Sequence, residues 1–277
     1  MASNGTAMPA IAVVSHDSLA DLRRFLPGQA RVAGALGVPL AVVDNASADG
    51  GAAYLEGLRE STPQLLLSLQ PRNLGFAAAV NVAFSLVEDR DVLVLNPDVE
   101  LDDPAGVREL ARHMESHPEV GVCAPRLAFP DGSVQPSARR PASLAAMLGS
   151  RSAARLAPPL RSRYERYLRA ATDGAGEADW VIGAAMLIRR SAFEGVGGMD
   201  EGFFLYMEDA DLCRRMRRAG WDVAYVPSVT MRHDYRRASS AAGASALSDP
   251  ARRRHIASLA RYWRKHPGAL IGRDARR

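Results

Sequence analysis

Two aspartates follow short apolar runs in the first half of this 277-residue chain, Asp44 directly and Asp98 after Asn96 and Pro97. Asp98 comes after Val92–Leu95 and Asp44 after Leu40–Val43. Apolar runs without alternation are typical of strands buried on both faces, and Pro97 ends the first run because its ring removes a backbone donor. Ligands of open α/β sheets bind beyond the carboxyl ends of the strands, so we expect both carboxylates at one crevice. Asp98 offers a hard oxygen ligand to Mg²⁺ or Mn²⁺ beside a phosphate, although a turn aspartate that caps the next helix gives the same pattern.

His233 is a second candidate metal ligand, because it follows the last apolar run, Tyr225–Val229. A neutral imidazole is compatible with Mn²⁺, and a structural histidine is the alternative interpretation. No GxGxxG follows the first strand, and GxxxxGK[ST] is excluded because the only lysine of the chain is Lys265. A bound diphosphate would therefore need a metal ion to neutralise its charge.

The elements that must position these residues alternate between strands and helices in the first half of the chain. Apolar runs predict strands at 11–14, 40–43, 65–69 and 92–95, with apolar stripes of helical spacing between them. This alternation predicts an α/β fold with a mostly parallel, doubly wound sheet and helices on both faces. The strand end Val14-Ser15 and the loop at 72–76 should then lie near Asp44 and Asp98.

The second half of the chain is less regular. We predict a helix at 104–117, a strand at 120–127 and a hairpin turn at 129–133, and interpret 137–176 as a surface excursion. Gly183 interrupts the apolar segment Trp180–Ile188, which in a strand indicates close approach of a ligand or of another backbone. A helix is predicted from near Asp209 to Gly220. We divide the chain into one domain at 1–235, with halves at 10–100 and 101–235, and a mobile loop with a basic terminal helix at 236–277.

Composition narrows the function classes. The net charge is +4, from 35 Lys and Arg against 31 Asp and Glu, and the pI is about 9.4. These charges are scattered and accompany no nucleic-acid recognition motif, so we expect no nucleic-acid partner. Cys123 and Cys213 are far apart in apolar surroundings and are interpreted as buried thiols of a reducing compartment. We expect a cytoplasmic protein, because no signal peptide and no membrane-spanning run is visible.

Six segments, in this order, resemble the glycosyltransferases of family 2, most closely their rhamnosyltransferase-like branch. They are Val-Val-Asp-Asn-Ala-Ser-Ala-Asp-Gly at 42–50, Asn-Leu-Gly-Phe-Ala-Ala-Ala-Val-Asn at 73–81, Leu-Asn-Pro-Asp-Val at 95–99, Gly-Ala-Ala-Met-Leu-Ile-Arg-Arg at 183–190, Gly-Gly-Met-Asp-Glu-Gly-Phe-Phe at 197–204 and Glu-Asp-Ala-Asp-Leu at 208–212. The resemblance implies a GT-A fold with a nucleotide-binding first half and an acceptor-binding second half. It also implies a nucleotide-sugar donor, a divalent cation and inversion of the anomeric carbon.

The resemblance assigns a role to each matching residue. Asp209 matches the catalytic base, although a carboxylate there could simply cap its helix. Asp98 matches the final acid of the metal motif, Asn96 stands where that motif has its first acid, and His233 matches the later metal ligand. Asp44 matches the residue that hydrogen-bonds the base of the nucleotide. The other residues expected around the donor are Val14, Ser15, Asn73, Gly75, Phe76, Gly183 and Ala184.

Together these features predict an inverting, metal-dependent glycosyltransferase. We expect it to move a sugar, best guessed as L-rhamnose from dTDP-L-rhamnose, to a hydroxyl of a cell-surface glycan or polyprenyl-linked acceptor. The alternatives are a transferase of UDP-hexose or UDP-N-acetylhexosamine, and a nucleotide-sugar or carbohydrate-binding module without turnover. The basic segment 250–266 carries an apolar stripe with Ile256, Leu259 and Trp263, which favours either peripheral contact with the inner face of the cell membrane or packing on the domain.

Overall fold

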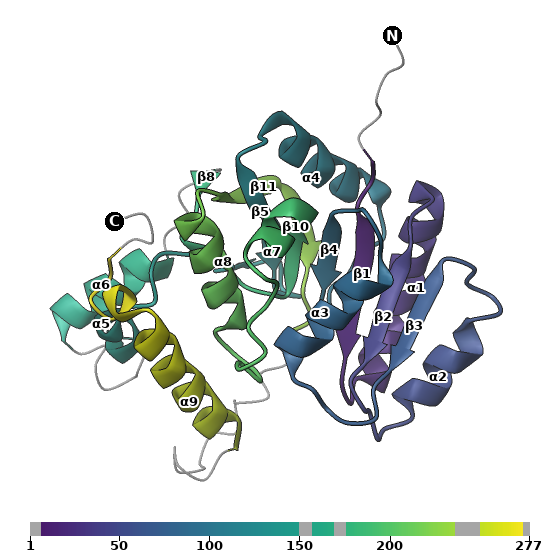
Figure 1. The fold of residues 1–277 in the computed structure, drawn as a ribbon, viewed down its shortest axis with the longest axis horizontal. Helices are drawn as coiled ribbons and strands as arrows, with labels where there is room; N and C mark the ends of the chain where they lie inside the picture. Colours follow the sequence, from purple (N-terminus) through teal and green to yellow (C-terminus); the bar gives the residue numbers. More distant parts are fainter. Residues whose placement is uncertain (1–6, 150–156, 169–175, 236–249, 274–277) are drawn as a thin grey trace.

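The computed structural model of the chain describes residues 7–149, 157–168, 176–235 and 250–273. The loop predicted at 236–249 therefore lies outside the described residues. The described chain forms one large sheet between helices, and the terminal helix α9 (Pro250–Lys265) lies at one end of the molecule near α5 and α6 (Figure 1). This is the α/β architecture that the alternation of strands and helices predicts.

The large sheet combines a parallel half with a mixed half. In spatial order its strands are β3 (Leu65–Leu69), β2 (Leu40–Asp44), β1 (Ala10–Ser15), β4 (Val92–Leu95), β10 (Ala185–Ile188), β5 (Val120–Ala128), β11 (Asp222–Arg232) and β8 (Gly176–Glu177). The first four run parallel, and β5 and β11 also pair in parallel. β10 is antiparallel to both neighbours and connects the two parallel groups. The short β6 (Val134–Gln135) pairs with β5 across the predicted hairpin turn.

Helices cover both faces of this sheet. They are α1 (Leu19–Leu36), α2 (Gly51–Leu58), α3 (Phe76–Leu86), α4 (Pro104–Ser116), α5 (Leu144–Gly149), α6 (Pro158–Leu168), α7 (Arg190–Gly195), α8 (Glu208–Arg218), α9 and α10 (Pro267–Leu270). Alternate side chains of β1 go to opposite faces: Ile11 and Val13 share a cluster with α1, α2 and α4, whereas Ala12 and Val14 share one with α3, α7 and α8. This two-residue period is that of a strand buried on both faces.

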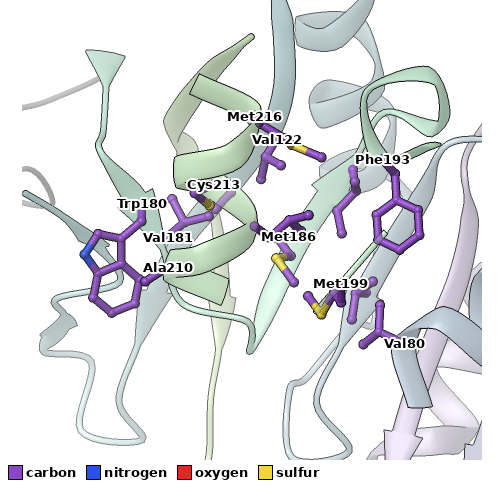
Figure 2. Packing of buried hydrophobic residues seen from close by; sticks show 14 of the residues in the cluster. Val80, Val122, Trp180, Val181, Met186, Phe193, Met199, Ala210, Cys213 and Met216 are labelled. Atoms are coloured by element: carbon purple, nitrogen blue, oxygen red, sulfur yellow. The ribbon is translucent and has the colours of Figure 1, made fainter. Parts of the chain in front are cut away.

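Helix α8 packs through its apolar side onto the mixed half of the sheet. Ala210, Cys213 and Met216 belong to the same cluster as Val181 and Met186, and Figure 2 shows these side chains gathered between α8 and the strands beneath it. Burial raises the pKa of the Cys213 thiol to about 12, so this cysteine is an inert packing residue at neutral pH. The buried side of α8 fixes the helix that carries Glu208 and Asp209.

The segment Trp180–Ile188 differs from the prediction of one interrupted apolar run. Trp180–Val181 forms β9, which pairs with β7 (Ala138–Arg139) in a separate two-stranded sheet, and only Ala185–Ile188 enters the large sheet as β10. Gly183 lies between them, and a Cβ atom on it would meet the Phe76 ring at 3.1 Å. The group that comes close to Gly183 is thus an aromatic side chain, and not another backbone.

The terminal helix α9 uses its apolar side for packing on the domain. Tyr262 is buried, and Leu259 and Trp263 pack against the core, whereas Ile256 is exposed. The Trp263 indole Nε1 donates to the carbonyl of Ala142 at 2.8 Å. Among the described helices, none has both the length and the apolar character needed to span a lipid bilayer.

Candidate active site

The predicted donor-site residues meet where β1, β2 and β4 end and β10 begins. Ser15 and Asp44 are register partners at the ends of β1 and β2. The Asn96 backbone N–H donates to the Ala184 carbonyl at 2.8 Å, so the turn after β4 lies against the residues before β10. Parallel strands bring their carboxyl ends to one edge, and the antiparallel β10 brings its amino end to the same edge.

Asp44 and Ser15 form a buried polar pair at this edge. Asp44 is 1% exposed and Ser15 is fully buried, while Val14 beside them is 7% exposed. The Ser47 N–H donates to Asp44 Oδ2 at 3.0 Å, whereas Asp44 Oδ1 and Ser15 Oγ have no hydrogen-bond partner among the described residues. Buried acceptors without a partner are costly, so this pair fits a ligand that brings an N–H donor, as a nucleobase does.

Asn45 holds the loop that contains Asn73, a role that the sequence did not reveal. Its side-chain amide is 2% exposed and donates to Asn73 Oδ1 at 3.0 Å and to the Gly75 carbonyl at 3.1 Å. Its oxygen accepts the Leu74 N–H at 2.7 Å. Asn73 Oδ1 in turn accepts the Gly75 N–H at 2.9 Å. The two asparagines therefore fix loop 73–76 beside Asp44, and the only sequence signal for Asn45 was its place next to that aspartate.

Gly75 and Phe76 connect this loop to a second loop, residues 200–207. The Phe76 N–H donates to the Phe204 carbonyl at 2.8 Å. A Cβ on Gly75 would lie only 2.4 Å from the same carbonyl oxygen, and Gly75 has φ +84°, so glycine is required there. The Phe76 ring meanwhile lies over Gly183. Four of the predicted residues, Gly75, Phe76, Gly183 and Ala184, thus share one contact region.

Asp98 and His233 are brought together as the proposed metal ligands require. His233 Nε2 lies 3.1 Å from Asp98 Oδ1, and its ring is 1% exposed. On the other side, His233 Nδ1 lies 2.8 Å from Gln135 Oε1, and the neutral tautomer that donates this hydrogen bond keeps a lone pair on Nε2. Two acceptors that face each other at this distance need a proton or a cation between them.

The donor set therefore fits Mg²⁺ or Mn²⁺, with Asp98 as a hard oxygen ligand and His233 as a nitrogen ligand. Within the described residues, no third His, Cys, Asp or Glu joins them to complete a metal cluster. Glu100 contacts Arg232 instead, with 2.6 Å between carboxylate and guanidinium. A diphosphate and water would supply the remaining ligands. Gln135 was missed by the sequence analysis because it lies far along the chain from His233.

Asp209 is held at the amino end of α8, directly beside Gly183. Asp209 Oδ2 accepts the Gly183 N–H at 2.9 Å and Oδ1 accepts the N–H of Ala210 at 2.8 Å. Burial raises the pKa of Asp209, while these two N–H groups and the charge of Arg139 oppose the rise. A half-buried carboxylate with a raised pKa, next to loop 73–76 (the donor loop), has the properties of a general base.

Glu208 is the more deeply buried neighbour of Asp209, at 5% exposed. Burial first, and then the charge of Asp209, raise the pKa of Glu208 well above its ordinary value. Its Oε2 atom has no hydrogen-bond partner among the described residues. The sequence analysis gave Glu208 no role beyond its place in the segment at 208–212.

A cavity of about 860 Å³ lies outside this contact region, between the start of α4 and the ends of β5 and β11. Glu100, Asp103, Phe129 and Arg232 are among the residues that line it. Asp44, Asp98 and Asp209 do not line this cavity, so it is separate from the site described above.

The chain is similar in sequence to known proteins. The model of the family described as glycosyl transferase family 2 matches residues 21–197, and one described as the N-terminal domain of galactosyltransferase matches residues 170–238. The chain is 34% identical over 243 residues to N-acetylglucosaminyl-diphospho-decaprenol L-rhamnosyltransferase of Mycobacterium tuberculosis, over 82% of this chain and 75% of that protein.

Two solved structures show the same fold. One is mannosyltransferase PcManGT from Pyrobaculum calidifontis in complex with GDP-Man and Mn²⁺, with a TM-score of 0.58 at 16% identity. The match covers 84% of this chain and 58% of the mannosyltransferase chain. S. aureus TarS in complex with UDP-GlcNAc has a TM-score of 0.57 at 13% identity and covers 85% of this chain and 61% of its own. The chain therefore spans less than two thirds of each of these solved chains. Both likenesses support the predicted GT-A fold.

Proposed function

The chain belongs to glycosyl transferase family 2 and is a glycosyltransferase, and we propose that it transfers L-rhamnose from dTDP-L-rhamnose to a hydroxyl of a lipid-linked glycan. The name of the Mycobacterium tuberculosis relative describes an L-rhamnosyltransferase that acts on a decaprenol-linked N-acetylglucosaminyl diphosphate. That relationship over 82% of this chain supports the sugar and the acceptor of the proposal. Two solved relatives carry GDP-Man and UDP-GlcNAc, and at their low identity they support the fold alone.

The observation that carries the chemical part of the proposal is the continuous contact from Asn96 through Ala184 and Gly183 to Asp209. It joins the turn that holds Asp98 to the carboxylate of the proposed base. One site can therefore act on both the departing diphosphate and the attacking hydroxyl. In the proposed reaction an acceptor hydroxyl attacks the anomeric carbon from the face opposite the diphosphate. Asp209 takes the hydroxyl proton, a new carbon–oxygen bond forms, and the bond to the diphosphate breaks with inversion.

The remaining residues bind and orient the donor. Asp44, with its unpartnered oxygen, and Ser15 would accept and donate hydrogen bonds to the base. The loop with Asn73 and Gly75 would cover the donor from the side that Asn45 fixes. When bound by Asp98 and His233, Mg²⁺ or Mn²⁺ would neutralise charge on the departing diphosphate.

We also propose that the enzyme meets its acceptor at the inner face of the cell membrane. Arg253, Arg254 and Arg264 are exposed on α9, whose apolar side is already packed on the domain. An exposed arginine face suits anionic lipid headgroups without insertion. The buried, unpaired Cys123 and Cys213 suit the reducing cytoplasm. Sedimentation with anionic liposomes should show binding that salt abolishes, and an equal amount bound to neutral liposomes would contradict this part.

The test of the reaction compares Asp209→Asn with wild type, using dTDP-L-rhamnose and a short-chain polyprenyl-diphosphate N-acetylglucosamine. We expect at least a hundredfold loss of transfer in the variant, because general-base catalysis contributes about 10²–10⁴-fold. Asp89→Asn is the control, because Asp89 is exposed and its positive φ of 52° is tolerated by asparagine. Equal rates in Asp209→Asn and wild type would refute the base, and transfer from UDP-sugars but not from dTDP-L-rhamnose would refute the donor.

A further inference from the structure

Loop 200–207, which leads directly into Asp209, has a backbone conformation that needs external support. Tyr206 and Met207 have φ of +72° and +70°, and neither is a glycine. Each residue in this left-handed region costs about 1–2 kcal/mol. The same loop carries the Phe204 carbonyl that accepts the Phe76 N–H of the donor loop. Its position therefore influences both the proposed base and the donor loop.

The terminal helix α9 contacts several residues of this loop. Ser258 Oγ donates to the Leu205 carbonyl at 2.8 Å, and the ring of His255 lies 4.9 Å from that of Tyr206. The guanidinium of Arg254 lies 5.0 Å from the centre of the Phe204 ring. Such contacts along a helix hold the adjacent loop as one unit.

Arg261 adds a contact at the beginning of the loop. A Cβ on Gly202 would lie 1.8 Å from its Nη2 atom, so the guanidinium rests directly on the glycine backbone. The same Nη2 atom donates to Asp200 Oδ1 at 3.1 Å. The start of the loop is therefore tied to α9 through both backbone and side chain.

Lys265 joins this loop to α8. Its Nζ atom lies 2.6 Å from Asp200 Oδ2 and 2.8 Å from Asp211 Oδ1. Asp200 begins the loop and Asp211 stands two residues after Asp209, so one ammonium group bridges both sides of the base. Lys265 is the only lysine among 35 cationic side chains. Its compact charge with three donors can serve two carboxylates at once.

The carboxylate of Asp211 is built to stay ionised in this position. It is fully buried, and His266 Nε2 and Arg215 Nε both lie 2.7 Å from its oxygens. Although burial alone would raise it, hydrogen bonds from His266 and Lys265 and the charge of Arg215 hold the pKa of Asp211 at about 2. Removing one partner from a buried ion cluster destabilises the local structure, because the other charges remain buried.

We propose that α9 is a clamp for loop 200–207 and that Lys265 is a positioning residue, which sets the loop and α8 so that Asp209 faces the donor site. The clamp itself is a structural statement, and its effect on catalysis rests on the proposed function. Donor binding is expected to be less affected, because loop 73–76 is also held by hydrogen bonds from Asn45 that do not involve α9.

Hydrogen exchange of Lys265→Met tests the clamp without any substrate. We expect exchange of amides in 203–212 to become about tenfold faster, in line with loss of a charge-assisted hydrogen bond, while amides of β1 and β2 keep their rates. Arg264→Met is the matched control, because Arg264 is the exposed neighbour on the same helix. Lys265→Arg keeps the charge and should restore slow exchange. Unchanged exchange in Lys265→Met, or equal acceleration in Arg264→Met, would overturn the proposal.

Kinetics test the effect on catalysis. At a temperature at which each variant is folded, Lys265→Met should lower kcat about tenfold and change the KM for the donor less than threefold, since small displacements of a reacting group are costly. Should Lys265→Met not fold, Asp200→Asn replaces it, because it removes the loop side of the bridge and leaves Asp211 with His266 and Arg215. Faster exchange with unchanged kcat would refute the positioning role. If amides 203–212 exchange faster in Lys265→Met than in wild type, but wild type transfers no sugar, the proposed function is refuted and the clamp remains supported.

Discussion

Replacing Gly75 by alanine is expected to damage the active site because its new Cβ would meet backbone atoms that cannot rotate away. The Cβ would lie 2.4 Å from the Phe204 oxygen and 2.8 Å from its Cα, so the oxygen contact must widen to at least 3.0 Å. Gly75 also has φ 84° and ψ 168°, a region that is essentially restricted to glycine. The two loops must move apart, and the hydrogen bond from Phe76 to Phe204 is lost with them.

The size of the effect follows from these two terms. Backbone strain costs about 1–3 kcal/mol and the lost hydrogen bond about 1 kcal/mol, so Gly75→Ala should lower the free energy of unfolding by about 2–4 kcal/mol. For a chain of this size the midpoint of thermal unfolding should fall by about 5–15 °C. Because the displaced loop leads into Asp209, kcat/KM should fall by about a hundredfold even where the protein is folded.

Gly57→Ala is the matched control. Gly57 lies in α2, and a Cβ there would meet nothing within 4 Å. Alanine should stabilise this helix by about 0.5–1 kcal/mol and leave transfer unchanged. Circular dichroism melting and initial rates of transfer measure both variants. A Gly75→Ala protein with kcat/KM within twofold of wild type would refute the contact between the loops as a requirement for activity.

Three further predictions concern titratable groups and the metal ligands. Glu208→Gln should keep most activity, because burial raises the pKa of Glu208 and favours its neutral form, which glutamine resembles. Transfer by wild type should rise as pH passes through the raised pKa of Asp209. Loss of activity in Glu208→Gln would contradict the assignment of the base. Gln135→Leu should weaken Mn²⁺ binding about 10–100-fold in calorimetry with nucleoside diphosphate, because His233 loses its orienting partner; unchanged affinity would show that Gln135 does not matter to the metal. The pKa of Asp211 is about 2 in the folded protein, against an ordinary 3.8. The stability that this carboxylate contributes is therefore complete at pH values above 3.8 and is lost as the pH falls through the folded-state pKa. On acidification, wild type should therefore lose about 2 kcal/mol of unfolding free energy that Asp211→Asn lacks at every pH. Parallel curves of unfolding free energy against pH for the two proteins would refute the ion cluster.

Residues at strand ends could be located from sequence because topology alone brings them together. β3 and β4 were predicted with their observed bounds, Leu65–Leu69 and Val92–Leu95, and the ends of β1 and β2 were placed within one residue. Because neighbouring parallel strands end at the same edge of a sheet, this arrangement brings together Ser15, Asp44 and the turn at Asn96. Their roles in binding remain predictions.

Contacts that depend on the path of distant segments could not be read from the sequence. Gln135 reaches His233 only because the hairpin of β5 and β6 folds back beside β11, 98 positions away. The division of Trp180–Ile188 at Gly183 depends on the Phe76 ring, which belongs to the other half of the chain. The apolar stripe of α9 was visible, but periodicity cannot tell a protein surface from a lipid surface. The burial of Tyr262 and the contacts of Trp263 decide in favour of the domain for that side of the helix.

The order of Glu208 and Asp209 explains why one of two adjacent carboxyl groups is suited to accept a proton. Asp209 receives two backbone N–H groups and is half-buried, so its anion is stabilised where a hydroxyl can reach it. Glu208 points into the protein without a partner for Oε2, and the charge of Asp209 raises its pKa further. Environments that separate the pKa values of neighbouring acids assign them different roles. That separation depends on where α8 begins. The strained Tyr206 and Met207 just before α8, and the helix α9 that contacts Tyr206, therefore help to set the chemistry of the base.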